Sequence, residues 1–224
     1  MNKAQTVNGS DGQPRCRWCA AAPEFEPYHD HEWGFPVGDD IRLFEKLCLE
    51  SFQSGLSWRT ILAKRENFRK AFDGFDFHRM ATYGERQVAR LLHDEGIVRH
   101  RGKIEAVIHN AGRAVELQAE CGSLAAYFWR YEGDRATAAP PQTVSTSPEA
   151  VALAKDLKKR GWKFVGPTTV YAFMQAMGLV NDHVPGCIMA RRVDQARAVF
   201  AVAHSGRWQT ASTLLPSGSI TKAP

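Results

Sequence analysis

Apolar residues recur at helical spacing along most of the chain from about residue 39 onward. In the first such segment Leu43, Phe44 and Leu47 share one stripe, and acidic residues stand at its start. Comparable stripes follow, opened by capping residues such as Ser57 and Ser147. The helices expected from this spacing cover residues 41–52, 57–72, 85–96, 103–115, 123–131, 148–160, 169–178 and 191–203. The sequence contains no run of alternating strand-like residues and no internal repeat, so it predicts a mainly α fold.

The two ends of the chain and one internal stretch lack this periodicity. Residues 1–14 are polar and are expected to form a flexible tail. Residues 132–147 contain adjacent prolines and small polar residues, which predict a surface loop. After the last helical segment the chain becomes rich in Ser, Thr and Pro, and little fixed structure is expected after about Gln209.

Composition narrows the class of protein without identifying it. Of 224 residues, 44% are hydrophobic and 24% are charged, which excludes a wholly disordered or fibrous chain. Lys and Arg total 29 against 24 for Asp and Glu, and the formal charge of +5 permits a polyanionic partner. No apolar run approaches the roughly 20 residues that cross a bilayer. The polar N-terminus also lacks the apolar core of a secretory signal, so we expect a cytoplasmic protein without membrane spans.

Cysteine and histidine residues gather near the two ends of the chain. Five cysteines are too few and too scattered for a disulfide scaffold in a chain of this length. The residue types and spacing indicate metal ligation, with the candidates Cys16, Cys19, His29, His31, His183 and Cys187. A zinc site built from both groups would tie the two ends together and contribute folding free energy. Spacing alone leaves the choice of four ligands open, and it also allows Cys16 and Cys19 to form a redox dithiol.

Residues 91–108 have the pattern of two helices joined by a tight turn at Gly96. Arg99, Arg101 and Lys103 stand near the start of the second helix. Amides of such a turn and of a helix N-terminus attract phosphate, and basic side chains add positive charge. The segment therefore suits contact with a nucleic acid backbone, while a plain helical hairpin with a solvated basic face would show the same pattern.

Aromatic residues are dense before residue 60, and one carboxylate stands among them. Glu50 follows the apolar residues Leu47, Cys48 and Leu49 and stands just ahead of Phe52 and the QSGLSW turn, and core packing does not explain a carboxylate there. Burying it among aromatic rings is costly unless a cation or a donor binds it. Such a site suits a flat, positively charged ligand held by stacking, cation–π attraction and a charge-assisted hydrogen bond.

Several longer segments strongly resemble the 3-methyladenine DNA glycosylase I family. They are RCRW (15–18), YHDHEWGFP (28–36), LFEKLCLESFQSGLSW (43–58), KREN (64–67), GIVRHRGKI (96–104), KKRGWKFVGPT (158–168) and MQAMGLVNDH (174–183), followed by Cys187. The resemblance implies a helix-hairpin-helix glycosylase domain over residues 15–189, with a tail over 1–14 before it. Residues 190–224 would be a C-terminal extension, partly helical and then without fixed structure.

The resemblance also implies an activity and a cofactor. The protein would be a monomeric DNA repair enzyme that flips out 3-methyladenine in alkylated double-stranded DNA and excises it by hydrolysis. It would be monofunctional, leaving an abasic site without a lyase step. One structural zinc ion would join the N- and C-terminal regions, and the resemblance places its ligands at Cys16, His29, His183 and Cys187.

The resemblance assigns further residues to the base and to the DNA. Glu50 would be the catalytic residue, and the base-binding residues would be Tyr28, Trp58, Trp18 and Trp33. The DNA-binding residues would be Gln53, Gly55 and Leu56, which fill the gap left by the extruded nucleotide, and Gly96, Arg99, Arg101 and Lys103, which grip phosphates. N3 methylation makes the base a cationic leaving group, so recognition and extrusion can supply much of the catalysis.

Two other interpretations use the same residues. One is a zinc-stabilised DNA-binding module that has kept the fold and lost catalysis, which the intact Tyr28, Glu50 and Trp58 disfavour. The other is a cytosolic thiol oxidoreductase that uses Cys16 and Cys19, but the strand–helix pattern that usually accompanies such a motif is missing. Release of free 3-methyladenine from alkylated DNA would separate all three.

Overall fold

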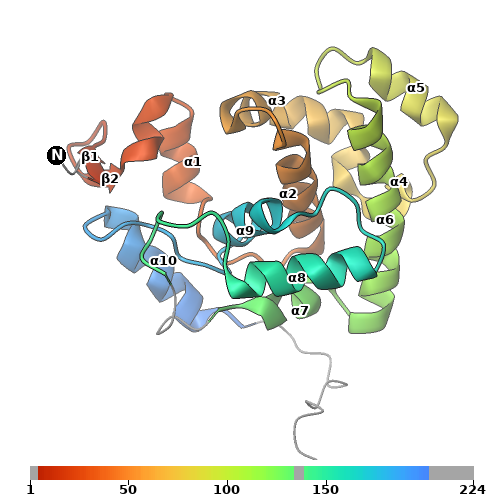
Figure 1. Cartoon of the computed structure of the whole chain (residues 1–224). Helices are drawn as coiled ribbons and strands as arrows, with labels where there is room; N and C mark the ends of the chain where they lie inside the picture. The colour runs from red at the N-terminus through yellow and green to blue at the C-terminus, as the bar shows by residue number, and fades with distance from the viewer. Residues whose placement is uncertain (1–4, 134–138, 202–224) are drawn as a thin grey trace, which may run out of the picture.

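The computed structural model describes residues 5–133 and 139–201, and this part of the chain is mainly helical, as the sequence predicts (Figure 1). The α-helices are α1 Phe25–His31, α2 Asp40–Gln53, α3 Trp58–Ala71, α4 Phe77–Met80, α5 Glu85–His93, α6 Arg101–Cys121, α7 Leu124–Phe128, α8 Pro148–Lys159, α9 Pro167–Ala176 and α10 Ile188–Val199. Short 3₁₀ helices occupy Arg17–Ala21, Asp73–Phe75 and Trp129–Tyr131. None of the helices in the described ranges has the length and apolar character needed to cross a membrane.

Capping residues set the starts of the helices that carry the site. Asp39, Ser57 and Ser147 each accept a hydrogen bond from the backbone amide three residues further on, at the starts of α2, α3 and α8. These are the starts that the sequence predicts. Helix α10 forms the first part of the C-terminal extension that the sequence predicts to be helical. The segment after Gln209, where little fixed structure is expected, lies outside the described residues.

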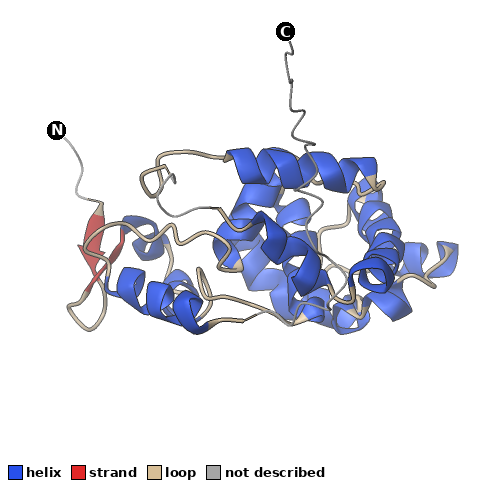
Figure 2. Cartoon of the chain, turned by 90° about the horizontal axis from the view of Figure 1, so that it is seen from below, coloured by secondary structure: helices blue, strands red, loops and turns tan. Residues whose placement is uncertain are grey.

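The N-terminal segment differs from the flexible tail expected over residues 1–14. Strand β1 (Thr6–Asn8) pairs antiparallel with β2 (Pro14–Cys16), and the pair stands at one end of the molecule (Figure 2). Arg15 is buried and donates to the carboxylates of Asp11 and Asp30. Three-residue strands are too short to show an alternating pattern, so this hairpin leaves no periodic signal in the sequence.

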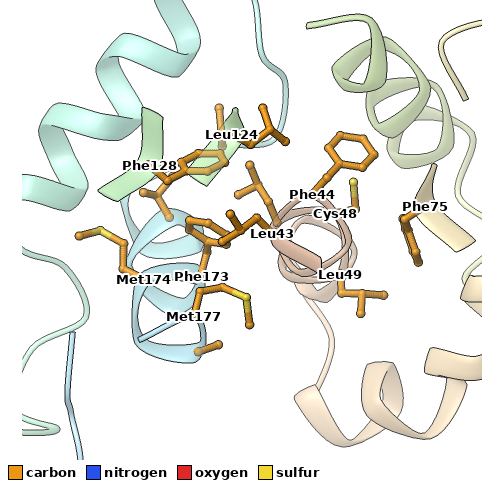
Figure 3. Packing of buried hydrophobic residues seen from close by; sticks show 14 of the residues in the cluster. Leu43, Phe44, Cys48, Leu49, Phe75, Leu124, Phe128, Phe173, Met174 and Met177 are labelled. Carbon is orange, nitrogen blue, oxygen red and sulfur yellow. The ribbon is translucent and has the colours of Figure 1, made fainter. Parts of the chain in front are cut away.

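Helix α2 runs through the centre of the molecule with α9 packed beside it (Figure 1). Every residue from Leu43 to Phe52 is buried, including the charged ones. Figure 3 shows Leu43 directed toward Phe173 of α9, whereas Phe44 and Cys48 leave α2 on the side away from α9. Since α2 is covered on several sides, its polar side chains need partners within the fold.

The predicted hairpin forms from α5 and α6 and is held against α3. Lys64 donates to the carbonyl oxygens of Glu95 and Gly96 at 2.9 and 3.3 Å, and Asn67 donates to Gly96 at 3.4 Å. A side chain at Gly96 would come within 3.1 Å of Asn67, so the turn packs closely on α3. The KREN segment therefore fixes the position of the hairpin.

Lys103 does not occupy the exposed position that phosphate contact requires. Its residue is 7% exposed, and its ammonium donates to the carbonyl oxygens of Phe52, at 2.9 Å, and Ser54. These carbonyls belong to the last turn of α2 and to the turn that follows. The expectation that Lys103 grips DNA phosphate is therefore wrong: the side chain ties the hairpin to the end of α2.

We predict that Lys103→Met destabilises the fold. The substitution leaves two carbonyl oxygens without their donor, which costs about 1–3 kcal/mol in the free energy of unfolding. Lys155→Met removes a charge from an exposed position on α8 and should stay within about 0.5 kcal/mol of the parent. Urea unfolding of both variants measures the difference, and equal midpoints would contradict the structural role.

Candidate functional site

A cavity of about 270 Å³ opens between α1, α2, the start of α3 and α9. The structure brings Glu50 together with all four aromatic residues expected to bind a base, and Gln53 adjoins them. The cavity is lined by Trp18, Tyr28, Trp33, Glu50, Gln53, Trp58, Gln142, Ala172, Gln175 and Asp182. Its volume suits one flat heteroaromatic ring system rather than a large ligand.

Aromatic rings form the walls of this cavity. Tyr28 and Trp58 lie with ring centroids 5.4 Å apart at 42°, and Trp18 meets Trp33 edge-on at 5.0 Å. The indole N–H of Trp58 is buried and has no hydrogen-bond partner among the described residues. An unpaired buried donor in a cavity wall is costly unless a bound molecule supplies the acceptor.

Glu50 is 6% exposed, and its partner within the chain is a lysine. Lys46, one helical turn earlier on α2, places its ammonium nitrogen 2.9 Å from Glu50 Oε1. The same nitrogen donates to the Tyr28 hydroxyl at 2.7 Å and stands 3.4 Å from the Trp58 ring centroid. Lys46 was not identified from the sequence, although a lysine four residues before a buried glutamate on one helix is a signal for such a pair.

Burial changes the protonation behaviour of the groups around Glu50. Desolvation lowers the pKa of Lys46, and the nearby Glu50 carboxylate opposes that shift. Desolvation, with the Glu50 charge adding to it, raises the pKa of Tyr28 well above its usual value. Tyr28 therefore stays a neutral phenol that accepts from Lys46.

The opposite wall of the cavity is polar and was not identified from the sequence. Asp182 is 3% exposed and accepts from the backbone amide of Gln142 at 2.9 Å and from the Gln175 side chain at 2.6 Å. Burial raises the pKa of Asp182. Gln175 and Asp182 stand in the MQAMGLVNDH segment, which could have indicated them, whereas Gln142 lies in a loop without any motif.

Cys16, His29, His183 and Cys187 form one buried cluster whose ligand atoms all lie within 4.8 Å of one another. His29 Nε2 stands 3.1 Å from His183 Nδ1, and Cys187 Sγ lies 3.5 Å from each nitrogen. Cys16 Sγ is 3.6 Å from His183 Nδ1. Two thiols and two imidazoles converging in this way could hold a metal ion.

Neighbouring groups orient both histidines of the cluster. His29 Nδ1 lies 2.7 Å from the Asp30 carboxylate, and His183 Nε2 lies 3.1 Å from the Trp33 carbonyl oxygen. Such partners fix the ring so that the other nitrogen faces a metal. Cys19 is buried outside the cluster and His31 is exposed, so the cluster contains only four of the six candidates.

The turn between α2 and α3 is exposed beside the cavity. Gly55 has φ +76, a conformation that glycine adopts without steric cost, and no atom lies within 4 Å of where its Cβ would be. Leu56 is 42% exposed. With Gln53 at the cavity edge, the turn presents an apolar side chain and an open backbone to solvent.

The α5–α6 hairpin carries two exposed arginines. The side chain of Arg99 is 50% exposed and lies 3.6 Å from Glu95. The side chain of Arg101 is 54% exposed and pairs with Glu105 at 3.0 Å. Exposed pairs of this kind contribute little to stability, so both guanidinium groups can exchange partners. With Gly96 in the turn, these residues keep the surface position expected for DNA contact.

Comparison with known proteins gives matches over most of the chain. The chain matches the family model for methyladenine glycosylase over residues 18–191. The DNA-3-methyladenine glycosylase 1 of Escherichia coli (strain K12) is 46% identical over 177 residues, covering 77% of this chain and 95% of that protein. The DNA-3-methyladenine glycosylase of Haemophilus influenzae is 40% identical over 178 residues, covering 77% and 96%.

Solved structures give the same result. A crystal structure of 3-methyladenine DNA glycosylase I superposes with a TM-score of 0.71 at 46% identity, covering 78% of this chain and 98% of that one. A Staphylococcus aureus structure that describes 3-methyladenine recognition superposes at 0.70 with 35% identity, covering 76% and 94%. The fold, the cavity and the matches confirm the resemblance in the sequence: this chain belongs to the methyladenine glycosylase family.

Proposed function

We propose that this chain excises 3-methyladenine from alkylated double-stranded DNA by hydrolysing the bond between base and deoxyribose. The observation that carries the proposal is a buried carboxylate, Glu50, in an aromatic cavity of the size of one base. The curated relatives are named for this activity, and a Tyr-to-Phe variant of one structural relative was solved in complex with 3-methyladenine. Chromatography of free bases released from methylated DNA tests the proposal. DNA binding without base release would instead support a module that has lost catalysis.

In this proposal, binding and extrusion of the methylated base supply most of the catalysis. The methylated base carries a positive charge in DNA and is already an activated leaving group. Tyr28 and Trp58 stack against it, Trp18 and Trp33 close the walls, and Glu50 accepts hydrogen bonds from the adenine edge. Extrusion costs less for a damaged base than for a paired one, which adds selectivity.

The same proposal makes the enzyme monofunctional. A lyase step would need an amine that is free to attack the sugar. Lys46 lies next to the cavity, but its ammonium is occupied by three cavity residues, Glu50, Tyr28 and Trp58. Borohydride should therefore trap no covalent complex between the protein and the DNA.

We infer that the buried cluster holds one structural zinc ion. Zinc bonds of about 2.3 Å to sulfur and about 2.0–2.1 Å to nitrogen, in tetrahedral geometry, require ligand separations close to the 3.1–3.6 Å found for four of the six ligand pairs. The ion would supply folding free energy, because Cys16 and His29 stand far in sequence from His183 and Cys187. Four protein ligands leave no open position for substrate.

The DNA face in this proposal combines the α2–α3 turn and the hairpin. Gln53, Gly55 and Leu56 would fill the gap left by the extruded nucleotide. Gly96, Arg99 and Arg101 would contact phosphates, with the first amides of α6 as further donors. We propose that the protein acts in the cytoplasm on chromosomal DNA, since the named relatives are DNA-3-methyladenine glycosylases of two bacteria. We also propose that it acts as a monomer.

Replacing a cysteine of the cluster should remove the metal, whereas replacing a cysteine outside it should not. Purified protein is expected to contain about one zinc per chain, and Cys187→Ser should lose it and melt at a lower temperature. In a chain of this size each kcal/mol shifts Tm by about 2–4 °C. Cys19→Ser, at a buried position outside the cluster, should keep the metal. Soluble, active protein without zinc by atomic absorption would contradict the assignment.

Replacing an exposed arginine of the hairpin should weaken DNA binding without regard to damage. Arg99→Ala and Arg101→Ala should lower affinity for methylated and unmethylated duplexes alike. The slope of log K against log salt should become shallower by about 1 for each lost phosphate contact. Fluorescence anisotropy across a salt series measures both quantities. A variant that loses only the preference for damaged DNA would contradict the assignment of Arg99 or Arg101 to phosphate contact.

Removing the charge of Glu50 should weaken base binding. Glu50→Gln keeps the shape and one carbonyl acceptor, and hydrogen bonds to charged groups contribute about 1.5–3 kcal/mol. Affinity for 3-methyladenine should therefore fall by about 10- to 100-fold, followed through the fluorescence of the cavity tryptophans. Ser51→Ala on the same helix is the control, because Ser51 donates to Leu47 and Phe164 carbonyls outside the cavity. Unchanged affinity beside a lower Tm would make Glu50 a core residue only.

A further inference from the structure

One ammonium group contacts three residues of the proposed base site. Lys46 and Glu50 are four residues apart on α2, so both side chains leave the same face of the helix. Lys46 is 5% exposed, and its three contacts are an ion pair with Glu50, a hydrogen bond to Tyr28 and the face of the Trp58 ring. An ammonium has three hydrogens, so these contacts use its whole donor capacity.

Lys46 approaches these residues from behind the cavity. It does not line the large cavity, but it lines a recess of about 20 Å³ on the other side of Tyr28 and Trp58. Glu32 and Arg65 line the same recess and form an ion pair with each other. A base in the cavity would therefore meet the aromatic rings and Glu50 without displacing Lys46.

Burying this pair only to stabilise the fold would gain little. A buried ion pair often stabilises a protein no more than well-packed apolar residues of similar volume would. An apolar side chain at position 46 would fill the same space between Tyr28 and Trp58. It would, however, leave Glu50 without a counter-charge and the Tyr28 hydroxyl without its donor.

We propose that Lys46 is a positioning residue for base excision: from behind the cavity wall its ammonium pairs with and orients the Glu50 carboxylate and fixes Tyr28 and Trp58. The inference deepens the proposed function and rests on it. Lys46 occupies Glu50 Oε1, which leaves Oε2 to accept from the base. The ammonium also offsets the cost of burying a carboxylate among aromatic rings.

The charge effect predicts a change in pH dependence. The charged groups facing Lys46 are Glu50 on α2, Glu32 after α1 and Arg65 on α3, with the phenol of Tyr28. Lys46→Met removes the positive charge closest to Glu50 and leaves the pair of Glu32 and Arg65. A buried carboxylate without an opposite charge beside it is disfavoured, so we expect the acid side of the excision profile to move to higher pH in this variant.

The test measures single-turnover release of 3-methyladenine between pH 5.5 and 9. The proteins are the parent, Lys46→Met, Lys46→Arg, Glu50→Gln, the double variant Lys46→Met/Glu50→Gln, and Lys70→Met as a control. Lys70 is exposed on α3, so its variant loses the same charge outside the site. Tm is recorded for each protein at each pH, and rates are compared only where the protein is folded.

Lys46→Met should release base slowly at pH 6 and recover at high pH, whereas Lys70→Met should follow the parent. Lys46→Arg keeps the charge but not the compact ammonium, so its maximal rate should fall while its acid side stays in place. The double variant should lose less than the sum of the two single losses, because part of the effect of Lys46 passes through Glu50. If Lys46→Met itself fails to fold, Lys46→Arg still tests the inference, and an unchanged maximal rate in that variant would contradict it.

Two further results would overturn the inference in recognisable ways. If the parent and Glu50→Gln behave as proposed but Lys46→Met keeps the parental pH profile and only melts earlier, Lys46 is a stability residue. An additive loss in the double variant leads to the same conclusion. If the parent releases no 3-methyladenine at any pH, the proposed function itself fails, and the role of Lys46 in it fails with it.

Discussion

The site depends on the burial of α2 from Leu43 to Phe52. All residues of this stretch are buried, so each of its polar groups must find a partner inside the fold. Glu45 pairs with Arg69 at 2.8 Å, and Ser51 donates to two carbonyl oxygens. Lys46 and Glu50 satisfy each other, and the remaining oxygen of Glu50 is what a ligand can use. The same constraint that builds the core thus creates a charged acceptor in an aromatic cavity.

The buried cluster of Cys16, His29, His183 and Cys187 shares a wall with the cavity. Tyr28 precedes His29 and Asp182 precedes His183, so two residues of the cluster place cavity residues beside them. Trp33 lines the cavity, and its carbonyl oxygen lies 3.1 Å from His183 Nε2. An ion in the cluster would therefore hold the cavity wall in shape from two distant parts of the chain, and loss of the metal would loosen the base site without removing any residue from it.

The sequence predicted eight of the ten α-helices in the described residues, and most of the cavity, because their signals are local or carried by long motifs. It did not predict the short helices α1 and α4, and α1 carries Tyr28 and His29. Glu50 could be recognised as a carboxylate among aromatic residues. Residue type and spacing reduced the possible metal ligands to six Cys and His residues. The prediction that Lys103 contacts DNA phosphate was wrong, because a position near the start of a helix does not show which way a lysine side chain points. The structure also corrected the N-terminal tail, whose order comes from the buried Arg15 rather than from periodicity. Gln142 could not be found, because its contact with Asp182 joins segments 40 residues apart.

The most direct measurement of the central claim is a crystal structure of the protein with 3-methyladenine and abasic-site DNA. We expect the base between Tyr28 and Trp58, with a hydrogen bond to Glu50 and with the Lys46 ammonium still on the far side of that carboxylate. A base bound outside the cavity, or a Lys46 side chain displaced into solvent when the base enters, would contradict the account.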